Sequence, residues 1–159
     1  MKRVVPFKLP IVDGYMCVNM EDKLTSIHFQ LPVPSGLKLH CDPQFMQNMQ
    51  MFLTDVYHHS LIQIPLDIVD IEGITPFQLQ VYHTLIQCPR GAVMTYGELS
   101  EKSGFGLAAR AVGTAMAKNP LPLLIPCHRV IQSSGELGQY NGGKDLKRAF
   151  LENEGATLP

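Results

Sequence analysis

Long apolar segments are missing from this sequence, and their absence argues against membrane-spanning helices. Nowhere do about 18 uncharged apolar residues follow one another, which is the length that a transmembrane helix needs. Near the start, two prolines, Lys8 and Asp13 interrupt any apolar run of signal-peptide length. We therefore expect a soluble protein that is not exported, has no membrane partner, and resides in the cytoplasm, or in the nucleus of a eukaryote.

Paired cysteines are also lacking. The four cysteines, at positions 17, 41, 88 and 127, form no Cys-x-x-Cys pair and no disulfide-dense pattern. Such usage suits a reducing compartment, where thiols stay free and one of them can act as a nucleophile. Cys17, His28, His40 and Cys41 do not reproduce the spacing of a zinc site, so we expect no metal and no other cofactor.

The chain has no excess of positive charge, since thirteen Lys and Arg face fourteen Asp and Glu. The broad basic surface of many nucleic-acid-binding proteins is therefore not expected. Up to residue 70 there are five basic and seven acidic residues, and beyond it eight and seven. The slight basic bias lies in the C-terminal part.

Residues 1–72 predict a small α/β domain. Residues 14–19 and 24–30 have the composition of strands joined by a tight turn, which indicates a small antiparallel sheet. Residues 42–60 lack glycine and place apolar side chains at helical spacing, so a helix should pack on that sheet. Residues 62–71, which contain Pro65, predict an edge strand followed by a linker.

Residues 73–159 predict a mainly helical domain, which makes the whole chain α+β. Thr75 followed by proline should begin a helix that runs to about residue 86. Thr95 and Glu98 fit a capping box that opens a short helix, which Gly104 ends. A further helix should span residues 107–118. The last two helices outline a helix-turn-helix, although many helical hairpins that bind no DNA look the same.

The helix predicted over residues 107–118 is made almost entirely of small side chains, with Arg110 as the only long charged one in its interior. Alanine and glycine at these positions would suit tight packing against a neighbouring helix. They would equally allow the helix to enter a narrow DNA groove, with the arginine inserted. The lone arginine favours the second interpretation.

A cysteine and a histidine stand together at positions 127 and 128, between a proline-rich apolar run and two β-branched residues. A buried cysteine is usually an inert small hydrophobe, and a neighbouring histidine is usually a satisfied polar group. Their spacing alone does not decide between an inert and a reactive thiol.

Several short segments together resemble one known family. They are Thr75-Pro76-Phe77-Gln78, Thr95-Tyr96-Gly97-Glu98-Leu99, Ala109-Arg110-Ala111-Val112-Gly113, Asn119-Pro120, Pro126-Cys127-His128-Arg129-Val130, Gly135, Tyr140-Asn141-Gly142-Gly143, Lys147 and Leu151-Glu152-Asn153-Glu154-Gly155. In order and spacing they resemble the O6-alkylguanine-DNA alkyltransferases, also called methylated-DNA-protein cysteine methyltransferases. The resemblance covers about residues 73–156, roughly half of the chain.

The resemblance implies a fold, a reaction and a partner. The fold is an N-terminal α/β domain followed by a helical domain with a winged helix-turn-helix. The reaction is DNA repair by a single, stoichiometric transfer of the alkyl group from O6-alkylguanine to Cys127, with O4-alkylthymine as a further candidate substrate. The partner is double-stranded DNA that carries O6-alkylguanine, bound by a monomer.

The resemblance also assigns catalytic roles. Cys127 is the acceptor, activated by proton transfer through water to His128, which Glu154 orients. An ordinary thiol is only a few per cent thiolate at neutral pH, so such a relay increases the attacking species. Tyr96 would donate a hydrogen bond to the guanine as charge develops on the leaving oxygen, a task that suits a phenol.

Further residues are assigned to DNA and base binding by the same resemblance. They are Arg110, Ala109, Ala111 and Gly113 on the small-residue helix, Asn119 at the turn before the cysteine, and Val130, Tyr140, Asn141 and Lys147 around the base. The sequence departs from the family at three positions: Tyr82 replaces a common Trp, Gln139 a common Gly, and Asn141 a common Ser or small residue. We expect the first to be core packing and the other two to affect which alkyl groups fit.

Three other functions remain as alternatives. A DNA-damage binder without transfer activity would lack the acceptor cysteine, so Cys127 argues against it. A thiol hydrolase or redox protein would need a substrate pocket and repeated turnover. A structural helical domain would carry an inert thiol. The stoichiometry of the reaction separates these possibilities.

Overall fold

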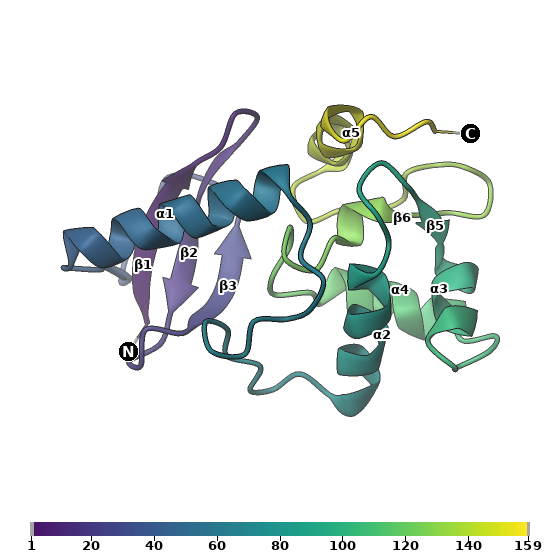
Figure 1. Cartoon of the computed structure of the whole chain (residues 1–159), viewed down its shortest axis with the longest axis horizontal. Helices are drawn as coiled ribbons and strands as arrows, with labels where there is room; N and C mark the ends of the chain where they lie inside the picture. Colours follow the sequence, from purple (N-terminus) through teal and green to yellow (C-terminus); the bar gives the residue numbers. More distant parts are fainter. Residues whose placement is uncertain (1, 159) are drawn as a thin grey trace.

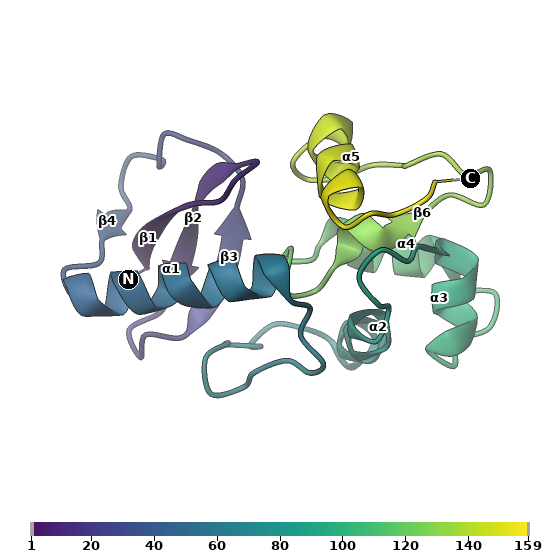
Figure 2. The same cartoon turned by 45° about the horizontal axis from the view of Figure 1, so that its top comes forward.

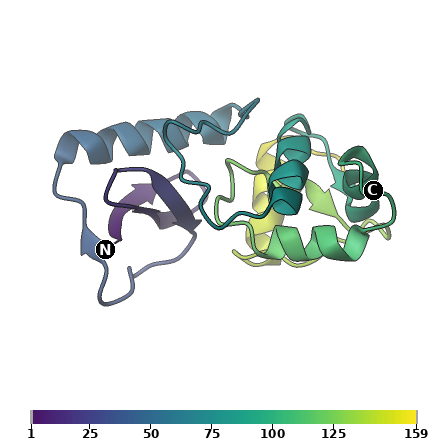
Figure 3. The same ribbon diagram turned by 90° about the horizontal axis from the view of Figure 1, so that it is seen from below.

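The computed structural model describes residues 2–158 and consists of two packed parts. A sheet with one long helix forms the N-terminal part, and four shorter helices with a two-stranded sheet form the C-terminal part (Figure 1). The same division is visible from the other two directions (Figures 2 and 3). Residues 1 and 159, the outer ends of the two predicted domains, lie outside the described residues.

The N-terminal sheet is mostly antiparallel, as the sequence predicted. Its strands are β1 (Arg3–Lys8), β2 (Asp13–Val18), β3 (Leu24–His28) and β4 (Lys38–Leu39), in the spatial order β3-β2-β1-β4. The predictions for β2 and β3 are confirmed to within two residues. The sequence analysis missed β1, because Pro6 at its centre suggests a break, and it missed the short β4, which pairs in parallel with β1.

Helix α1 (Pro43–His58) confirms the helix predicted over residues 42–60. It begins at Asp42, whose carboxylate accepts hydrogen bonds from two backbone N–H groups of the first turn. Its buried residues, among them Leu53 and Val56, pack toward the sheet, which the helix crosses on one face (Figure 1).

The edge strand predicted within residues 62–71 is wrong. Only Val69 forms an isolated bridge, with Leu24 at the end of the sheet. The backbone N–H groups of Ile68 and Val69 both donate to the carbonyl of Pro65. This turn interrupts an extended strand, and the segment pairs with the sheet at Leu24, whose N–H donates to the carbonyl of Ile68 and whose carbonyl accepts from the N–H of Asp70.

The C-terminal part contains four helices and a 3-10 turn. They are α2 (Pro76–Ile86), α3 (Tyr96–Lys102), α4 (Ala109–Ala117) and α5 (Lys144–Asn153), with a 3-10 turn at Cys127–Arg129. Capping boxes at Thr75 and Thr95 begin α2 and α3. Strands β5 (Met94–Thr95) and β6 (Val130–Ile131) pair in parallel beside the α3–α4 helix-turn-helix, so the expected α+β architecture is confirmed.

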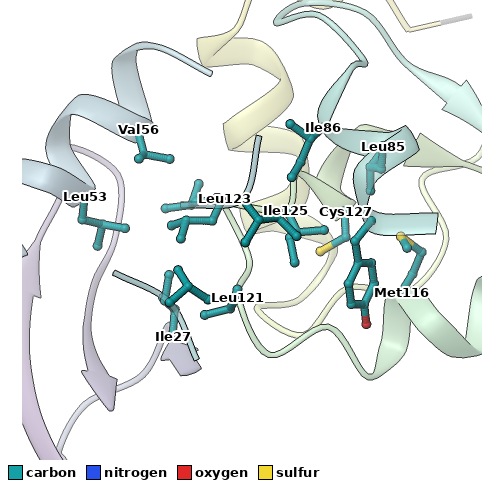
Figure 4. Packing of buried hydrophobic residues seen from close by; sticks show 14 of the residues in the cluster. Ile27, Leu53, Val56, Leu85, Ile86, Met116, Leu121, Leu123, Ile125 and Cys127 are labelled. Carbon is teal, nitrogen blue, oxygen red and sulfur yellow. The ribbon is translucent and has the colours of Figure 1, made fainter. Parts of the chain in front are cut away.

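One hydrophobic cluster extends through both parts of the molecule. Figure 4 shows Ile27, Leu53 and Val56 from the N-terminal part facing Leu121, Leu123 and Ile125, which lead to Cys127. The backbone also joins the parts, because the N–H of Ile27 donates to the carbonyl of Pro120 at 2.9 Å. Among residues 2–158, no helix is both long and apolar enough to cross a bilayer.

Candidate active site around Cys127

Cys127 lies at the wall of a pocket of about 140 Å³ that opens beside α4. The lining residues come from α3, α4, the 3-10 turn and the loop before α5; they are Tyr96, Gly113, Met116, Ala117, Cys127, Gln139, Tyr140 and Asn141. The cysteine is only 6% exposed. A molecule must therefore enter this pocket to reach the thiol.

The segment before the cysteine is fixed by Asn119, which is buried. Its side-chain N–H donates to the carbonyl of Ile125 at 2.9 Å, and its oxygen accepts from the N–H of Leu121 at 2.9 Å. Within this turn Leu123 adopts a left-handed φ of 78°, which an apolar side chain tolerates only where its surroundings hold it. The turn thus gives Cys127 a defined position.

The electrostatic surroundings keep the Cys127 thiol protonated at rest. Burial raises its pKa above the ordinary value, while the Asn119 side chain and the Lys147 ammonium act in the opposite direction. Because only the thiolate is a strong nucleophile, this thiol could react only if a nearby group accepted its proton.

His128 is placed to be that group. Its Nε2 lies 2.9 Å from Oε1 of Glu154, and the buried Nδ1 has no hydrogen-bond partner among the described residues. Burial lowers the pKa of His128, although Glu154 opposes this shift, so the ring is neutral at rest. When the Nε2–H group donates its hydrogen bond to the carboxylate, Nδ1 is unprotonated and its lone pair can accept a proton.

Arg129 completes this network, and the sequence analysis gave it no role. Its guanidinium donates to both carboxylate oxygens of Glu154, at 2.7 and 2.9 Å, and to the carbonyl of Cys88 at 2.7 Å. It also donates to the Ser60 hydroxyl at 2.6 Å. An arginine inside an otherwise apolar, buried segment signals a carboxylate partner, but the sequence alone does not identify which one.

Glu154 is an ionised carboxylate with its position fixed from two sides. Burial alone would raise its pKa, but the hydrogen bonds from His128 and Arg129 outweigh burial and lower the pKa to about 2. Its side chain is only 6% exposed. The carboxylate therefore stays charged under all ordinary conditions and holds the imidazole in one orientation.

The phenol of Tyr96 lines the same pocket. Burial, and then the nearby Cys127, raise its pKa, so it remains a hydrogen-bond donor at neutral pH. A side chain at Gly138 would place its Cβ 3.2 Å from the Tyr96 hydroxyl oxygen. Glycine at this position leaves the hydroxyl free to face the pocket.

Lys147 is fully buried, and its ammonium is occupied by backbone. It donates to the carbonyl of Val130 at 2.6 Å and also to that of Leu137. Burial lowers its pKa to about 8, with Cys127 opposing. Lys147 thus ties β6 to the following loop instead of lining the pocket, and Val130, which is fully buried, does not line it either.

The small-residue helix α4 has two different sides. Val112, Ala115 and Met116 are buried, whereas Arg110 and Ala111 are exposed and Ala109 is half-buried. Gly113 lines the pocket, where an added Cβ would lie 3.9 Å from the Tyr96 ring. Close packing explains the small residues of the inner side only. The outer side is exposed and carries small side chains with one arginine.

The three departures from the family pattern have distinct positions. Tyr82 is fully buried and its hydroxyl donates to the carbonyl of Ala115 at 2.8 Å, so it supports the inner side of α4. Gln139 and Asn141 line the pocket next to Cys127.

Among residues 2–158, no group of three or more His, Cys, Asp or Glu side chains is arranged to hold a metal ion.

Comparison with known proteins gives the following matches. Residues 76–156 match the family model "6-O-methylguanine DNA methyltransferase, DNA binding domain". A methylated-DNA–protein-cysteine methyltransferase from Methanothermobacter thermautotrophicus is 36% identical over 115 residues, which cover 72% of this chain and 62% of that protein. One from Mycobacterium bovis is 45% identical over 91 residues, covering 57% and 54%. The matched segments thus span little more than half the length of these relatives.

Solved structures agree over nearly the whole chain. The crystal structure of Mycobacterium tuberculosis OGT in complex with DNA has 32% sequence identity and a TM-score of 0.75, and covers 97% of this chain and 92% of that one. The O6-methylguanine-DNA methyltransferase from Pyrococcus kodakaraensis has 27% identity and a TM-score of 0.76, and covers 98% and 100%. The likeness therefore includes the N-terminal part as well as the site around Cys127.

Proposed function

The chain belongs to the 6-O-methylguanine DNA methyltransferase family, and from this premise we propose that it repairs DNA by moving the alkyl group of an O6-alkylguanine onto Cys127. The observation that carries the proposal is a buried thiol at the wall of a pocket, next to an imidazole whose free nitrogen can take the thiol proton. The relatives that share this segment are named for the same transfer.

The reaction begins with loss of the thiol proton. His128 accepts it at Nδ1 through a bridging water, because neighbouring residues in a 3-10 turn do not present their side chains to each other directly. The carboxylate of Glu154 stabilises the imidazolium that results. The reactive thiolate therefore forms inside the pocket, where the alkylated base binds.

The thiolate sulfur then attacks the carbon attached to O6. A new S–C bond forms, the O6–C bond breaks, and its electron pair leaves with the guanine. Tyr96 donates a hydrogen bond to the guanine as this charge develops. The guanine anion then takes up one proton, which balances the proton that the thiol gave to His128. The products are an unmodified guanine and an S-alkylcysteine, a thioether that none of the pocket side chains is suited to cleave, so each molecule reacts once.

The target carbon lies within the base stack, so the nucleotide must rotate out of the duplex to enter the pocket. The exposed side of α4, with Ala109, Ala111 and Ala117, is smooth enough to lie in the minor groove. Arg110 projects from it to fill the space that the extruded base leaves. The M. tuberculosis relative, solved in complex with DNA, supports DNA as the partner.

The proposal also covers the residues that contact the guanine, the oligomeric state, the domains and the location of the protein in the cell. Asn119 keeps the turn before Cys127 in place, while the backbone of Val130 and Asn141 and the ring of Tyr140 contact the guanine. Lys147 acts by holding that backbone. The protein acts as a monomer with two domains, residues 1–72 and 73–159, in the cytoplasm or in a eukaryotic nucleus. O4-alkylthymine is a second candidate substrate.

The decisive experiment measures intact mass after incubation with duplex DNA that carries O6-methylguanine. We expect a gain of one CH₂ per molecule, located at Cys127, and no further turnover. The Cys127→Ser variant should gain nothing while it binds DNA within a few-fold of the wild type, because the groove contacts lie on α4. Binding of damaged DNA without any mass gain by the wild type would instead identify a damage-binding protein.

A further inference from the structure

The N-terminal part supplies none of the eight residues that line the pocket, yet it contacts the pocket wall from behind. Two aromatic side chains make the contact: Tyr57 of α1, whose ring centroid lies 6.3 Å from that of Phe150, and Phe29, which directly follows β3 and is half-buried. Of these two, only Phe29 also stacks on Tyr140. Its ring centroid lies 6.3 Å from that of Tyr140 at 29°, and 5.5 Å from that of Phe150 at 51°. These separations fall within the range of about 4.5–7 Å at which aromatic rings attract one another.

Tyr140 and Phe150 connect this contact to both working sides of the site. Tyr140 lines the pocket, and its ring centroid lies 6.3 Å from that of Phe150. Phe150, on α5, lies 5.3 Å from the ring of His128. Phe29, Tyr140 and Phe150 thus form an aromatic cluster, joined also by Phe7 and Tyr57, that contacts the base-lining loop at one end and the ring of His128 at the other.

The loop itself is shaped to receive Phe29. A Cβ added to Gly142 would lie 3.3 Å from Cδ2 of Phe29 and 2.4 Å from Cδ2 of Leu146. A larger residue at this position would require Leu146 to move and Phe29 to give way slightly. A second link nearby, from the N–H of Ile27 to the carbonyl of Pro120, holds the turn that begins at Asn119. The end of β3 therefore supports both segments that flank Cys127.

We propose that Phe29 is a positioning residue, which holds the base-lining loop of residues 139–143 and, through Phe150, the ring of His128 in the arrangement that the transfer needs. This inference rests on the proposed function. It gives the N-terminal part a task in the reaction, although that part touches neither the thiol nor the pocket. Loss of the ring should leave Tyr140 with one open side, so the loop would sample positions that do not fit the guanine.

The test compares Phe29→Ala with Phe45→Ala. Phe45 is a matched control, because it is also half-buried in the N-terminal part and also stacked, on His40 at 4.3 Å, but it belongs to α1 and takes no part in the ring cluster. For Phe29→Ala we expect a single-turnover rate at saturating DNA about tenfold to a hundredfold lower, since small misplacements are costly in catalysis. The DNA dissociation constant should stay within about twofold, and Phe29→Tyr should restore the rate.

Hydrogen exchange of the backbone provides a second measurement, which does not depend on alkyl transfer. The backbone N–H groups of residues 140–143 should exchange faster in Phe29→Ala but not in Phe45→Ala. Wild-type exchange together with a wild-type rate would overturn the inference, as would equal losses of rate in both variants. If Phe29→Ala melts below the assay temperature, Phe29→Leu, which keeps most of the volume, replaces it. Failure of the wild type to transfer an alkyl group would count against the proposed function, and the exchange arm would still decide the role of Phe29.

Discussion

The side chains around Cys127 give each proton of the site a defined place. The thiol keeps its proton because it is buried, His128 is neutral because it is buried, and Glu154 is charged because Arg129 and His128 hold it. These three protonation states change only when the Cys127 thiol loses its proton to His128. The proposed nucleophile is thus protected from adventitious reaction until a substrate fills the pocket.

Tyr96→Phe should slow the saturated transfer rate by about tenfold to a thousandfold, because one lost donor to a developing charge is worth a few kcal/mol. Binding of DNA should change little. Tyr82→Phe is the matched control, since it removes a buried hydroxyl that bonds to the backbone of α4 and lies outside the pocket. Single-turnover kinetics of both variants make the measurement, and an unchanged rate in Tyr96→Phe would remove Tyr96 from the mechanism.

Glu154 should make the free energy of unfolding depend on pH under acidic conditions. Its folded pKa of about 2 lies below the unfolded value of about 4.3, so the carboxylate stabilises the fold above about pH 4.3. That stability, on the order of 3 kcal/mol, is lost as pH falls from about 4.3 toward 2.

Urea unfolding across this pH range tests the expectation. Glu154→Gln should be less stable than the wild type at neutral pH and should approach it as the pH falls. Transfer by this variant should also be slower. Glu152→Gln, which alters an exposed carboxylate of α5, is the control. A constant stability difference between wild type and Glu154→Gln at every pH would contradict the ionised network.

For single residues, the sequence identifies the reactive side chains better than it identifies the hydrogen-bond partners of the residues around them. The motif around positions 126–130 singled out Cys127 and His128; Cys127 lies at the pocket, and His128 is buried behind it. It did not indicate that Arg129 would bind Glu154 and Ser60, because those partners lie 25 and 69 positions away in the chain. Lys147 was expected near the base, but its ammonium donates to two backbone carbonyls. The sequence does not show that Lys147 is buried, and burial determines which partners it can reach.

At the scale of helices and strands, local signals were sufficient where caps were present. Asp42, Thr75 and Thr95 fixed the starts of three helices through side-chain bonds to the backbone. Helix α4 begins two residues later than predicted, and its N-terminal residue Ala108 makes no side-chain cap bond. Strand β1 and the bridge at Val69 depend on contacts with distant strands, which local composition does not report.

Helix α4 supports a prediction that separates two roles for Arg110. If the arginine occupies the space of the extruded base, Arg110→Ala should slow the saturated transfer rate on a fully paired duplex. It should slow it less opposite a mismatch or in a single strand, where extrusion costs little. Lys118→Ala, at the end of the same helix, is a control for a phosphate contact; it should reduce the salt dependence of binding and leave the bound rate unchanged. Equal slowing of Arg110→Ala on all three substrates would show that Arg110 does not hold the extruded state.

At the scale of the whole molecule, the two predicted domains share more than a linker. The hydrophobic cluster runs from the sheet to Cys127, the N–H of Ile27 bonds to Pro120, and Arg129 bonds to Ser60. The sequence suggested a boundary near residue 73 because residues 62–71 contain Pro65 and two aspartates, lack a helical period and therefore indicated a linker. It could not indicate how closely the two parts pack, since that depends on which apolar faces meet.

A shared core predicts that both parts unfold together. Two buried free cysteines report on them separately, because Cys17 lies in β2 and Cys88 follows α2. In a urea series with brief thiol labelling, followed by mass spectrometry of peptides, both should become reactive at the same urea concentration, as a two-state transition requires. The exposed Cys41 should react throughout and serves as the internal control. If Cys17 became reactive at clearly lower urea than Cys88, the sheet would unfold on its own, and the packing of β3 against the pocket wall would be too weak to keep the base-lining loop in place.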